Sequence, residues 1–313
     1  MGFDKNINKQ KKLLMNKIII NADDFGASKE INNGILYLIK KKKISSTSVI
    51  ANGIFINTYI KKLKNINKKI FSVGVHLNLT SGKSLRKNLN YICNKKNYFN
   101  RSLFFFFFII YFSPKKKKIL NQIYLELDAQ INFLKKKKLA ISHLDSHNHV
   151  HSNPLIFRIV KKLAIKHNIK IIRSLNEKII FKNFFLNFKK KILKLNYLKF
   201  IIVRVNKFFN SNNNIIFYGL IESGLINRNY INNIFRDAKN QTFEICVHPS
   251  KQTKAIKGVK EIVKKYYNKK DVESFYSVER SNEFSELCKL KLNKKFLSLI
   301  NFNNINKTLK NKI

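Results

Sequence analysis

Four short segments of the chain combine histidine and aspartate residues in a pattern that could support metal chemistry. Of the seven histidines, only His167 lies outside these segments. The segments are NADDFG at 21–26, GVHLNL at 74–79, SHLDSHNHVH at 142–151 and CVHP at 246–249. Imidazole and carboxylate groups are the ligands of catalytic divalent metals that keep one open coordination position. The residue types therefore predict a metal-dependent hydrolase.

Each segment lies at the end of a run that is typical of a buried parallel strand. Strands that are covered on both faces read as nearly continuous apolar runs. The expected strands are residues 17–21, 46–51, 72–75, 140–144, 169–172 and 242–247, with a further apolar segment at 296–300. Because the C-terminal ends of parallel strands meet at one edge of a sheet, we expect the four segments to lie close together.

Helical patterns alternate with these strands. Ser28 can cap the first helix, and Asn153 with Pro154 forms an N-cap and N1 pair for a later one. The other expected helices cover residues 118–134, 228–238 and 281–290. The alternation predicts an α/β fold, a (β/α) barrel or barrel variant in a single domain, with a doubly wound open sheet as the alternative. Ligand candidates on early, middle and late strands favour the barrel, because closure brings distant strand ends around one mouth.

The adjacent acids Asp23 and Asp24 fit two separate roles. Successive side chains of an extended segment point in different directions, so one carboxylate can bind a metal while the other faces the reacting water. An Asx-type turn that caps the next helix is the alternative. The apolar strand before the two acids and the histidines elsewhere favour the functional interpretation.

Polar side chains alternate in the third segment, at His143, Asp145, His147, His149 and His151. Alternate side chains of an extended strand share one face, and five buried polar groups would be costly there without a metal or hydrogen-bond partners. We therefore expect a strand that points all five into the site. His143 and Asp145 would orient metal-binding imidazoles, and His149 and His151 would contact ligands or substrate. An exposed polar strand is the alternative.

Three further positions complete the candidate site. His76 follows an apolar strand, where a lone histidine could also be an ordinary core residue. His248 follows the strand 242–247 and is either a general acid or a helix-cap donor. Arg173 follows the strand 169–172 and either holds a carboxylate or a substrate oxygen in place or is a surface arginine.

The composition gives a formal charge of +46, from 63 Lys and Arg against 17 Asp and Glu. Such an excess would ordinarily indicate a polyanionic partner. Here the lysines form homopolymeric runs at 40–43, 115–118 and 135–138 beside abundant Ile, Asn and Phe, all residues with A/T-rich codons. Drift in an AT-rich genome explains this composition, so we expect no specific nucleic-acid partner.

The cysteines and the apolar segments bear on location. Cys93, Cys246 and Cys288 have no CxxC spacing, which favours a reducing compartment and a cytoplasmic location. Residues 1–16 lack the apolar core of a secretory signal. The apolar run 103–112 is shorter than the ~20 residues of a transmembrane helix. We therefore expect no transmembrane segment, and a buried segment or a lid over the site at this run, with contact to a lipid-like substrate as the alternative.

The segments NADDFGASKEINNGI, VGVHLNLTSGKSL, SHLDSHNHVHSNP and EICVHPS resemble the signature blocks of the YdjC-like carbohydrate deacetylases, which include chitooligosaccharide deacetylases. FYGLIESGLI at 217–226 resembles the hopanoid-biosynthesis-associated branch in particular. The resemblance departs from the family where His-Pro-Ser replaces the usual HPG or HPA, and along 175–214, where little can be aligned. It places a deacetylase domain at 17–302, between a disordered basic extension, 1–16, and a basic tail, 303–313.

The resemblance implies a barrel-like α/β fold and one divalent metal held by Asp24, His76 and His147, with Asp23 as the catalytic base and His248 lining the site. The implied reaction is hydrolysis of the N-acetyl group of an amino sugar, in an oligosaccharide or a glycolipid, through a metal-activated water. One Asp and two neutral His suit Zn²⁺, and Mg²⁺, Mn²⁺ or Co²⁺ are also compatible. Another metallohydrolase such as a phosphoesterase, and a basic polyanion-binding protein that has lost catalysis, stay open as alternatives. The sequence also leaves open whether the protein forms a homodimer.

Overall fold

The structure is a computed structural model and describes residues 16–180, 197, 200–201, 215–237, 241–252, 257–292 and 297–310. The expected N-terminal extension lies outside the described residues except for Asn16. Most of the stretch 175–214, where little can be aligned with the family, lies outside them as well.

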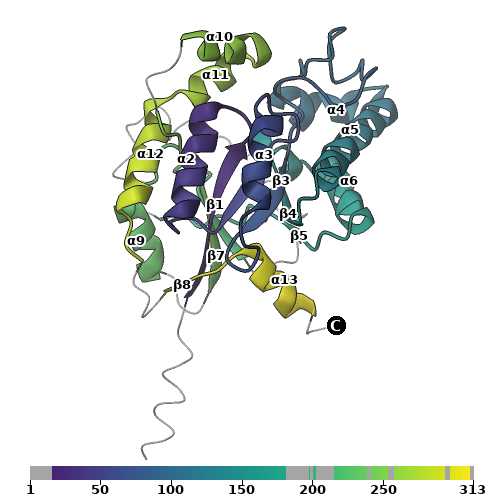
Figure 1. The fold of residues 1–313 in the computed structure, drawn as a ribbon. Coiled ribbons are helices and arrows are strands. Elements are labelled where there is room, and N and C mark those ends of the chain that lie inside the picture. The colour runs from purple at the N-terminus through teal and green to yellow at the C-terminus, as the bar shows by residue number, and fades with distance from the viewer. Residues whose placement is uncertain are drawn as a thin grey trace, which may run out of the picture.

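A single sheet of parallel strands forms the centre of the molecule (Figure 1). Hydrogen-bonded neighbours follow the order β5-β4-β3-β2-β1-β7-β6, and β8 pairs with the start of β1. The strands are β1 (Asn16–Phe25), β2 (Ser46–Val49), β3 (Ser72–Leu77), β4 (Ile141–Ser146), β5 (Ile171–Ile172), β6 (Ile215–Tyr218), β7 (Thr242–Val247) and β8 (Leu297–Leu299).

The strand order is the cyclic order of a barrel and not the reversed order of a doubly wound sheet. Strands β1 to β5 follow one another in space as in the chain, and β7 pairs with the other side of β1. Beyond β5, Glu177 forms a parallel bridge with Phe217 of β6, which joins the two edges of the sheet. The predicted α/β barrel variant is confirmed.

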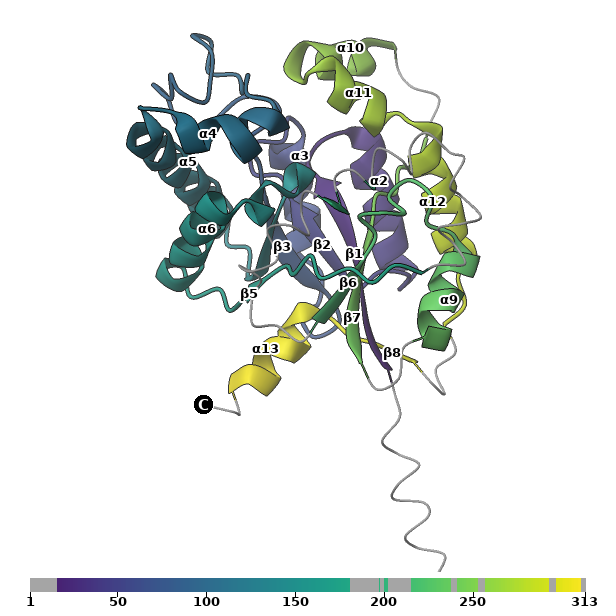
Figure 2. The ribbon, with the colours of Figure 1, turned by 180° about the vertical axis from the view of Figure 1, so that it is seen from behind.

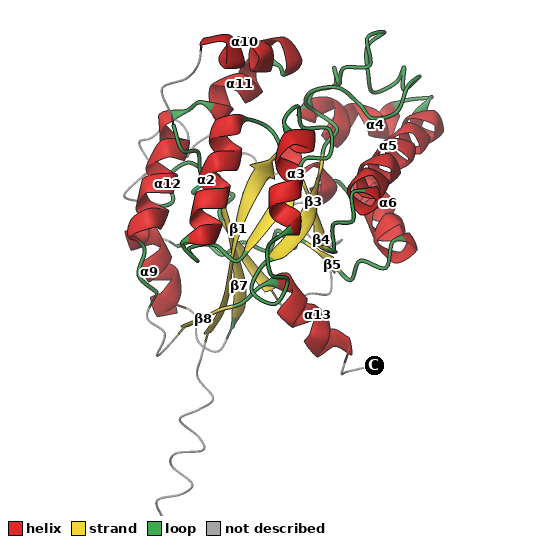
Figure 3. Cartoon of the chain, in the orientation of Figure 1, coloured by secondary structure: helices red, strands yellow, loops and turns green. Residues whose placement is uncertain are grey.

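Helices cover the outside of the sheet, as the red elements of Figure 3 show. In Figure 2, α10 and α11 lie beyond the end of the sheet at which the β1 arrow points, whereas α13 lies at the opposite end. The helices are α2 (Lys29–Lys40), α3 (Ile56–Lys64), α4 (Ile110–Phe112), α5 (Lys116–Lys136), α6 (Pro154–Lys166), α9 (Arg228–Asp237), α10 (Lys257–Tyr266), α11 (Lys269–Phe275), α12 (Val278–Lys289) and α13 (Phe302–Lys310).

Local sequence explains where the two capped helices begin. The Ser28 side chain accepts a hydrogen bond from the Ile31 N–H at 3.2 Å and caps α2. The Asn153 side chain accepts from the Leu155 N–H at 2.8 Å, and Pro154 starts α6 with its fixed backbone angle. Both starts agree with the sequence predictions. Helices α3, α10 and α11 were not predicted, and α13 occupies most of the expected basic tail.

The strands that carry site residues run further than their apolar runs indicated. Asp23 and Asp24 belong to β1 and His76 to β3, and the expectation that they follow the strands is wrong in this detail. In the ladder, His76 lies opposite Asp145 of β4. This pairing keeps His76 extended and in register, whereas Asp23 and Asp24 lie in an irregularity of the β1–β2 ladder between Ala22 and Phe25.

The phenylalanine-rich run forms a π-helix, η2 (Phe105–Ile109), followed by α4. Phe106 is fully buried, whereas Phe112 is 88 % exposed, so the expected buried segment is only half correct. Asn153 donates a hydrogen bond to the Phe106 carbonyl at 2.8 Å, which joins this segment to the start of α6. Within the part of the chain that the structure describes, no helix combines the length and apolarity needed to cross a membrane.

Candidate metal centre

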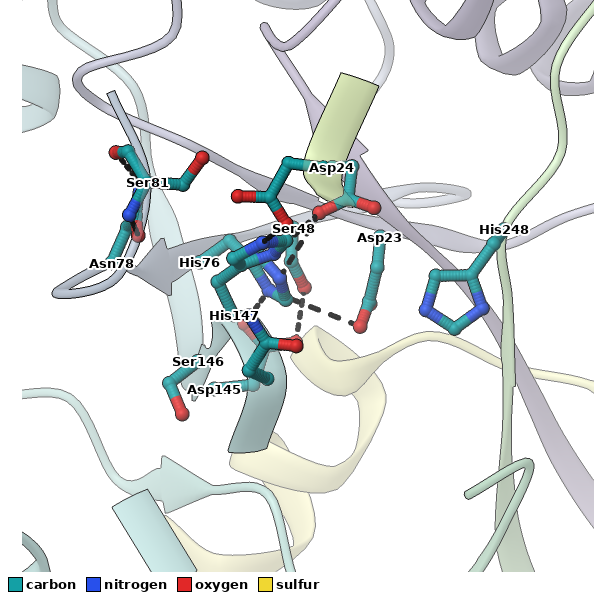
Figure 4. A network of polar contacts seen from close by, with 12 residues as sticks. Asp23, Asp24, Ser48, His76, Asn78, Ser81, Asp145, Ser146, His147 and His248 are labelled. Atoms are coloured by element: carbon teal, nitrogen blue, oxygen red, sulfur yellow. Dashed lines mark hydrogen bonds and ion pairs between the residues drawn. The ribbon is translucent and has the colours of Figure 1, made fainter. Parts of the chain in front are cut away.

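Asp24, His76 and His147 come together at the C-terminal ends of β1, β3 and β4 (Figure 4). Oδ1 of Asp24 lies 3.3 Å from Nε2 of His76 and 3.0 Å from Nδ1 of His147. One ligand atom from each residue lies within 4.8 Å of the other two, and all three residues are buried. Two imidazoles and one carboxylate in this arrangement form a donor set for a catalytic divalent metal.

The second nitrogen of each histidine faces another carboxylate. Nδ1 of His76 lies 2.9 Å from Oδ1 of Asp145, and Nε2 of His147 lies 3.3 Å from Oδ1 of Asp271. A carboxylate in this position accepts the ring N–H, which fixes the tautomer and turns the other nitrogen toward a metal. The histidine pair is therefore oriented from both sides.

The surrounding carboxylates favour a positive charge at this centre. Burial alone would lower the pKa of His76, but the charges of Asp145 and Asp23 outweigh burial and raise the pKa to about 10. Burial also acts to lower the pKa of His147, and the hydrogen bond and charge of Asp24 raise it to about 9. A divalent cation would supply the positive charge that these acids stabilise, with both histidines neutral. The residues present therefore fit a metal.

Asp24 has a backbone conformation that is rare for a residue with a side chain. Its φ is +68°, in the left-handed region, and such strain is concentrated at functional sites. Its Oδ2 accepts a hydrogen bond from Nη2 of Arg280 at 2.5 Å. Burial would raise the pKa of Asp24, but the Arg280 charge keeps the pKa well below the usual range.

Asp23 points to a different partner, the guanidinium of Arg173. Nη1 and Nη2 of Arg173 donate to the two carboxylate oxygens of Asp23, each at 2.7 Å. The same guanidinium lies 2.7 Å from Asp145 and donates to Glu244 at 2.8 Å. Burial would raise the pKa of Asp23, but Arg173 and then His76 lower it far below the usual range, so this carboxylate is ionised. Arg173 is 2 % exposed and is not a surface arginine.

The expected extended strand across the third segment is wrong beyond Ser146. Residues His147–Ser152 form a 3-10 helix, η3, in which Asn148 and His149 have φ values of +54° and +55°. The Oγ of Ser146 accepts the His151 N–H at 3.0 Å and closes this turn. The five alternating side chains therefore do not share one face, although Asp145 and His147 both reach the centre.

His143 lies beneath the centre and not in it. Its Nε2 is 3.2 Å from Oγ of Ser48, which in turn donates to Oδ2 of Asp145 at 2.5 Å. The ring stacks on Phe302 with a centroid distance of 3.8 Å. A Cβ on Gly74 would come within 2.4 Å of this ring, so the GVH segment needs glycine at its first position.

His149 and His151 pack against residues around the centre. The His149 ring meets Phe217 edge to face at 5.9 Å. His151 lies 2.5 Å from Oγ of Ser146 through Nδ1 and 3.3 Å from the carbonyl oxygen of Arg173 through Nε2. Burial lowers the pKa of His151 to about 4 and that of His149 well below the usual range, so both are neutral. His151 supports the loop that carries Arg173.

His248 lies beside Asp23 at the end of β7 (Figure 4). Its backbone N–H donates to Oε2 of Glu283 at 2.6 Å, and the Gly224 N–H donates to Oε1 at 2.9 Å. Burial, and then the Arg280 charge, lower the pKa of His248 to about 4. Glu283 thus fixes the backbone that presents a neutral imidazole to the site.

Three residues of the C-terminal helices support the site and were missed by sequence reasoning. Asp271 of α11 contacts His147, and Arg280 and Glu283 of α12 contact Asp24 and the His248 backbone. Arg280 and Glu283 are one helical turn apart on α12, but the predicted helix, 281–290, began after Arg280, so their shared direction was missed. Nothing in the sequence indicated their partners.

Comparison with known proteins assigns the chain to a family. Residues 17–297 match the family model described as YdjC-like protein, and the chain belongs to this family. A carbohydrate deacetylase of Clostridium beijerinckii is 32 % identical over 155 residues, which cover 50 % of this chain and 59 % of the relative. A carbohydrate deacetylase of Vibrio parahaemolyticus is also 32 % identical over 155 residues, covering 50 % of this chain and 58 % of the relative. The aligned part thus spans less than two thirds of these relatives.

One solved structure has the same fold along nearly the whole chain. It is a protein of Enterococcus faecalis V583 whose name suggests cellobiose-phosphate cleavage, with a TM-score of 0.56 at 20 % identity. The match covers 93 % of this chain and 99 % of that chain. At this identity the likeness supports the barrel-type architecture alone.

Proposed function

We propose that the chain is a metal-dependent deacetylase that hydrolyses the N-acetyl group of an amino sugar, in an oligosaccharide or linked to a lipid. The observation that carries this proposal is the convergence of Asp24, His76 and His147 beside the separate carboxylate of Asp23. Membership of the YdjC-like family and the names of the curated relatives support the substrate class.

In this proposal Asp24, His76 and His147 hold one divalent ion, Zn²⁺ or Mg²⁺, with Mn²⁺ and Co²⁺ as compatible substitutes. The ion supplies a Lewis acid for a water molecule and for the acetamide oxygen. Asp145 and Asp271 keep the two imidazoles in position, and Arg280 keeps the Asp24 carboxylate ionised. Each of these contacts acts on a ligand and not on the substrate.

Asp23 accepts the proton of the attacking water. Its pairing with Arg173 keeps it ionised, as a base must be, and fixes its direction through two hydrogen bonds of 2.7 Å. His248 transfers a proton to the departing amine. As a neutral imidazole it can accept a proton at one nitrogen while it donates from the other. The proton that Asp23 takes from water passes to His248, whose ring nitrogen lies within 4.8 Å of the carboxylate, while His248 gives a proton to the amine. The products are acetate and the free amino sugar, and both residues return to their starting protonation states.

The test is acetate release from N-acetylglucosamine oligomers by the metal-loaded protein, with Asp24→Asn and His147→Gln as inactive variants. Asn67→Asp is the control, because Asn67 is exposed on the loop before β3, and this variant should keep full activity. We expect acetate from the wild type and none from the two site variants. Metal binding without acetate release from any acetylated sugar or lipid-linked sugar would contradict the proposal, and phosphate release from phosphoesters would assign another metallohydrolase activity.

We also propose a cytoplasmic location. The cysteines Cys93, Cys246 and Cys288 are free thiols in the structure, which is usual for a reducing compartment. Fractionation of cells that express the native chain would test this assignment.

A further inference from the structure

A second set of potential metal ligands lies next to the centre and uses the base instead of Asp24. Asp23, Cys246 and His248 each offer one ligand atom, and these atoms all lie within 4.8 Å of one another. The Cys246 thiol donates to Oδ2 of Asp23 at 3.2 Å, and its sulfur lies 3.9 Å from Nε2 of His248.

The sheet places these three residues together. Cys246 and His248 are two positions apart at the end of β7, so both side chains point to the same side of the strand. The ladder sets Cys246 opposite Asn21 of β1, two residues before Asp23, which points to that same side. The arrangement therefore follows from the backbone and does not depend on a flexible side chain.

The distances suit a tetrahedral ion. With Zn–S of about 2.3 Å and Zn–N or Zn–O of about 2.0–2.1 Å, neighbouring ligand atoms of such a site lie about 3.5 Å apart. The separations of 3.2 Å and 3.9 Å bracket that value. Cys246 and Asp23 are buried, whereas His248 is partly exposed and gives an ion a way in from solvent.

The local charge can accept another cation. The centre contains five buried acids and two buried arginines: Asp23, Asp24, Asp145, Glu244 and Asp271, with Arg173 and Arg280. One divalent ion at the first centre would balance two of the three excess negative charges. A second ion that binds at Cys246 replaces the thiol proton, which leaves to solvent, and the new thiolate offsets part of its charge.

We propose that Asp23, Cys246 and His248 form a second cation site that is specific for thiophilic ions such as Zn²⁺ and Cd²⁺, and that filling it inhibits the enzyme. Inhibition follows because the ion occupies the carboxylate and the imidazole that the proposed reaction uses for proton transfer. The inhibition, unlike the binding of the ion, therefore rests on the proposed function. Hard ions such as Mg²⁺ bind thiolates poorly, so an excess of Mg²⁺ does not inhibit.

Titration of the full chain with Cd²⁺, followed by the ultraviolet charge-transfer absorption of the thiolate–Cd²⁺ bond, tests the site without reference to activity. We expect the band in the wild type and in His147→Gln, which changes only the first centre. The band should vanish in Cys246→Ser and persist in Cys288→Ser, whose thiol lies on α12 and is partly exposed. His248→Asn keeps the thiol, and the Cd²⁺ concentration at half-saturation should rise about tenfold or more.

A band that persists in Cys246→Ser, an absent band in the wild type, or an unchanged half-saturation in His248→Asn would overturn the second site. Acetate release measured with rising Zn²⁺ then tests the consequence. The wild type should lose activity at excess Zn²⁺, and the inhibitory concentration should rise about tenfold or more in Cys246→Ser, each variant compared with its own maximum. A chain that shows the Cys246 band but no acetate release with any metal would contradict the proposed function and leave the second site established.

Discussion

Arg173 should be the residue whose loss costs the most stability in the site. In Arg173→Met the guanidinium that pairs with Asp23, Asp145 and Glu244 disappears, and three buried carboxylates lose their shared cation. Removing one partner of a buried ion pair costs about 3–5 kcal/mol. The unfolding entropy of a 313-residue chain is about 0.66 kcal/mol/K, so Tm should fall by roughly 5–8 °C.

Urea and thermal unfolding followed by circular dichroism would measure this loss. Arg236→Met, at an exposed position of α9, is the matched control and should change the free energy of unfolding by less than about 0.5 kcal/mol. Burial raises the pKa of Glu244 to about 7, so adding Glu244→Gln to Arg173→Met should recover part of the loss by removing one orphaned charge. A loss of unfolding free energy below about 1 kcal/mol in Arg173→Met would refute the conclusion that Arg173 stabilises three buried carboxylates.

Three further outcomes are expected. Asp271→Asn should weaken metal binding about 10-fold or more by releasing the His147 ring, measured by calorimetry, whereas Glu273→Gln on the exposed side of α11 should leave it unchanged. Glu283→Gln should destabilise the fold by about 1–3 kcal/mol, because its amide N–H₂ would face the backbone N–H of His248 or Gly224. An unfolding midpoint at the same denaturant concentration as the wild type would disprove this role. Chelation of a metal present at 100 times its Kd should lower Tm by about 4 °C in the wild type, and an equal fall in Asp24→Asn would contradict the assigned ligands.

The sequence predicted the capped helices and the parallel strands other than β6 (Ile215–Tyr218) because their causes are local. Continuous apolar runs mark strands covered on both faces, and Ser28 and Asn153 have the side chains that helix N-termini need. The fold class followed from the alternation of these elements. The convergence of Asp24 and His76 followed in turn, because the C-terminal ends of parallel strands share an edge.

The histidine-rich segment could not be predicted in detail from its spacing. Alternating polar residues indicate an extended strand, but a hydrogen bond from the His151 N–H to the Ser146 side chain and two left-handed residues, Asn148 and His149, bend the chain into η3. Asn and His both adopt this conformation more often than most residues, but neither requires it, so residue type did not indicate the bend. The alternation of polar residues alone does not distinguish an extended strand from a turn such as η3.

The contacts of α11 and α12 lay beyond sequence reasoning for another reason. Arg280 is 256 positions from Asp24, and Asp271 is 124 positions from His147. In a chain with 63 Lys and Arg, one arginine on a helix looks like any other surface cation. Only the folded positions of α11 and α12, which bring Asp271 to His147 and Arg280 to Asp24, identify these residues.

Anomalous diffraction from crystals soaked in Mn²⁺ would test the central claim most directly. Mn²⁺ is a hard ion that should avoid the Cys246 thiol, so it reports on the first centre alone. We predict one strong peak within bonding distance of Asp24 Oδ1, His76 Nε2 and His147 Nδ1. No peak among these three atoms at saturating Mn²⁺, or a peak bound only to other residues, would contradict the account.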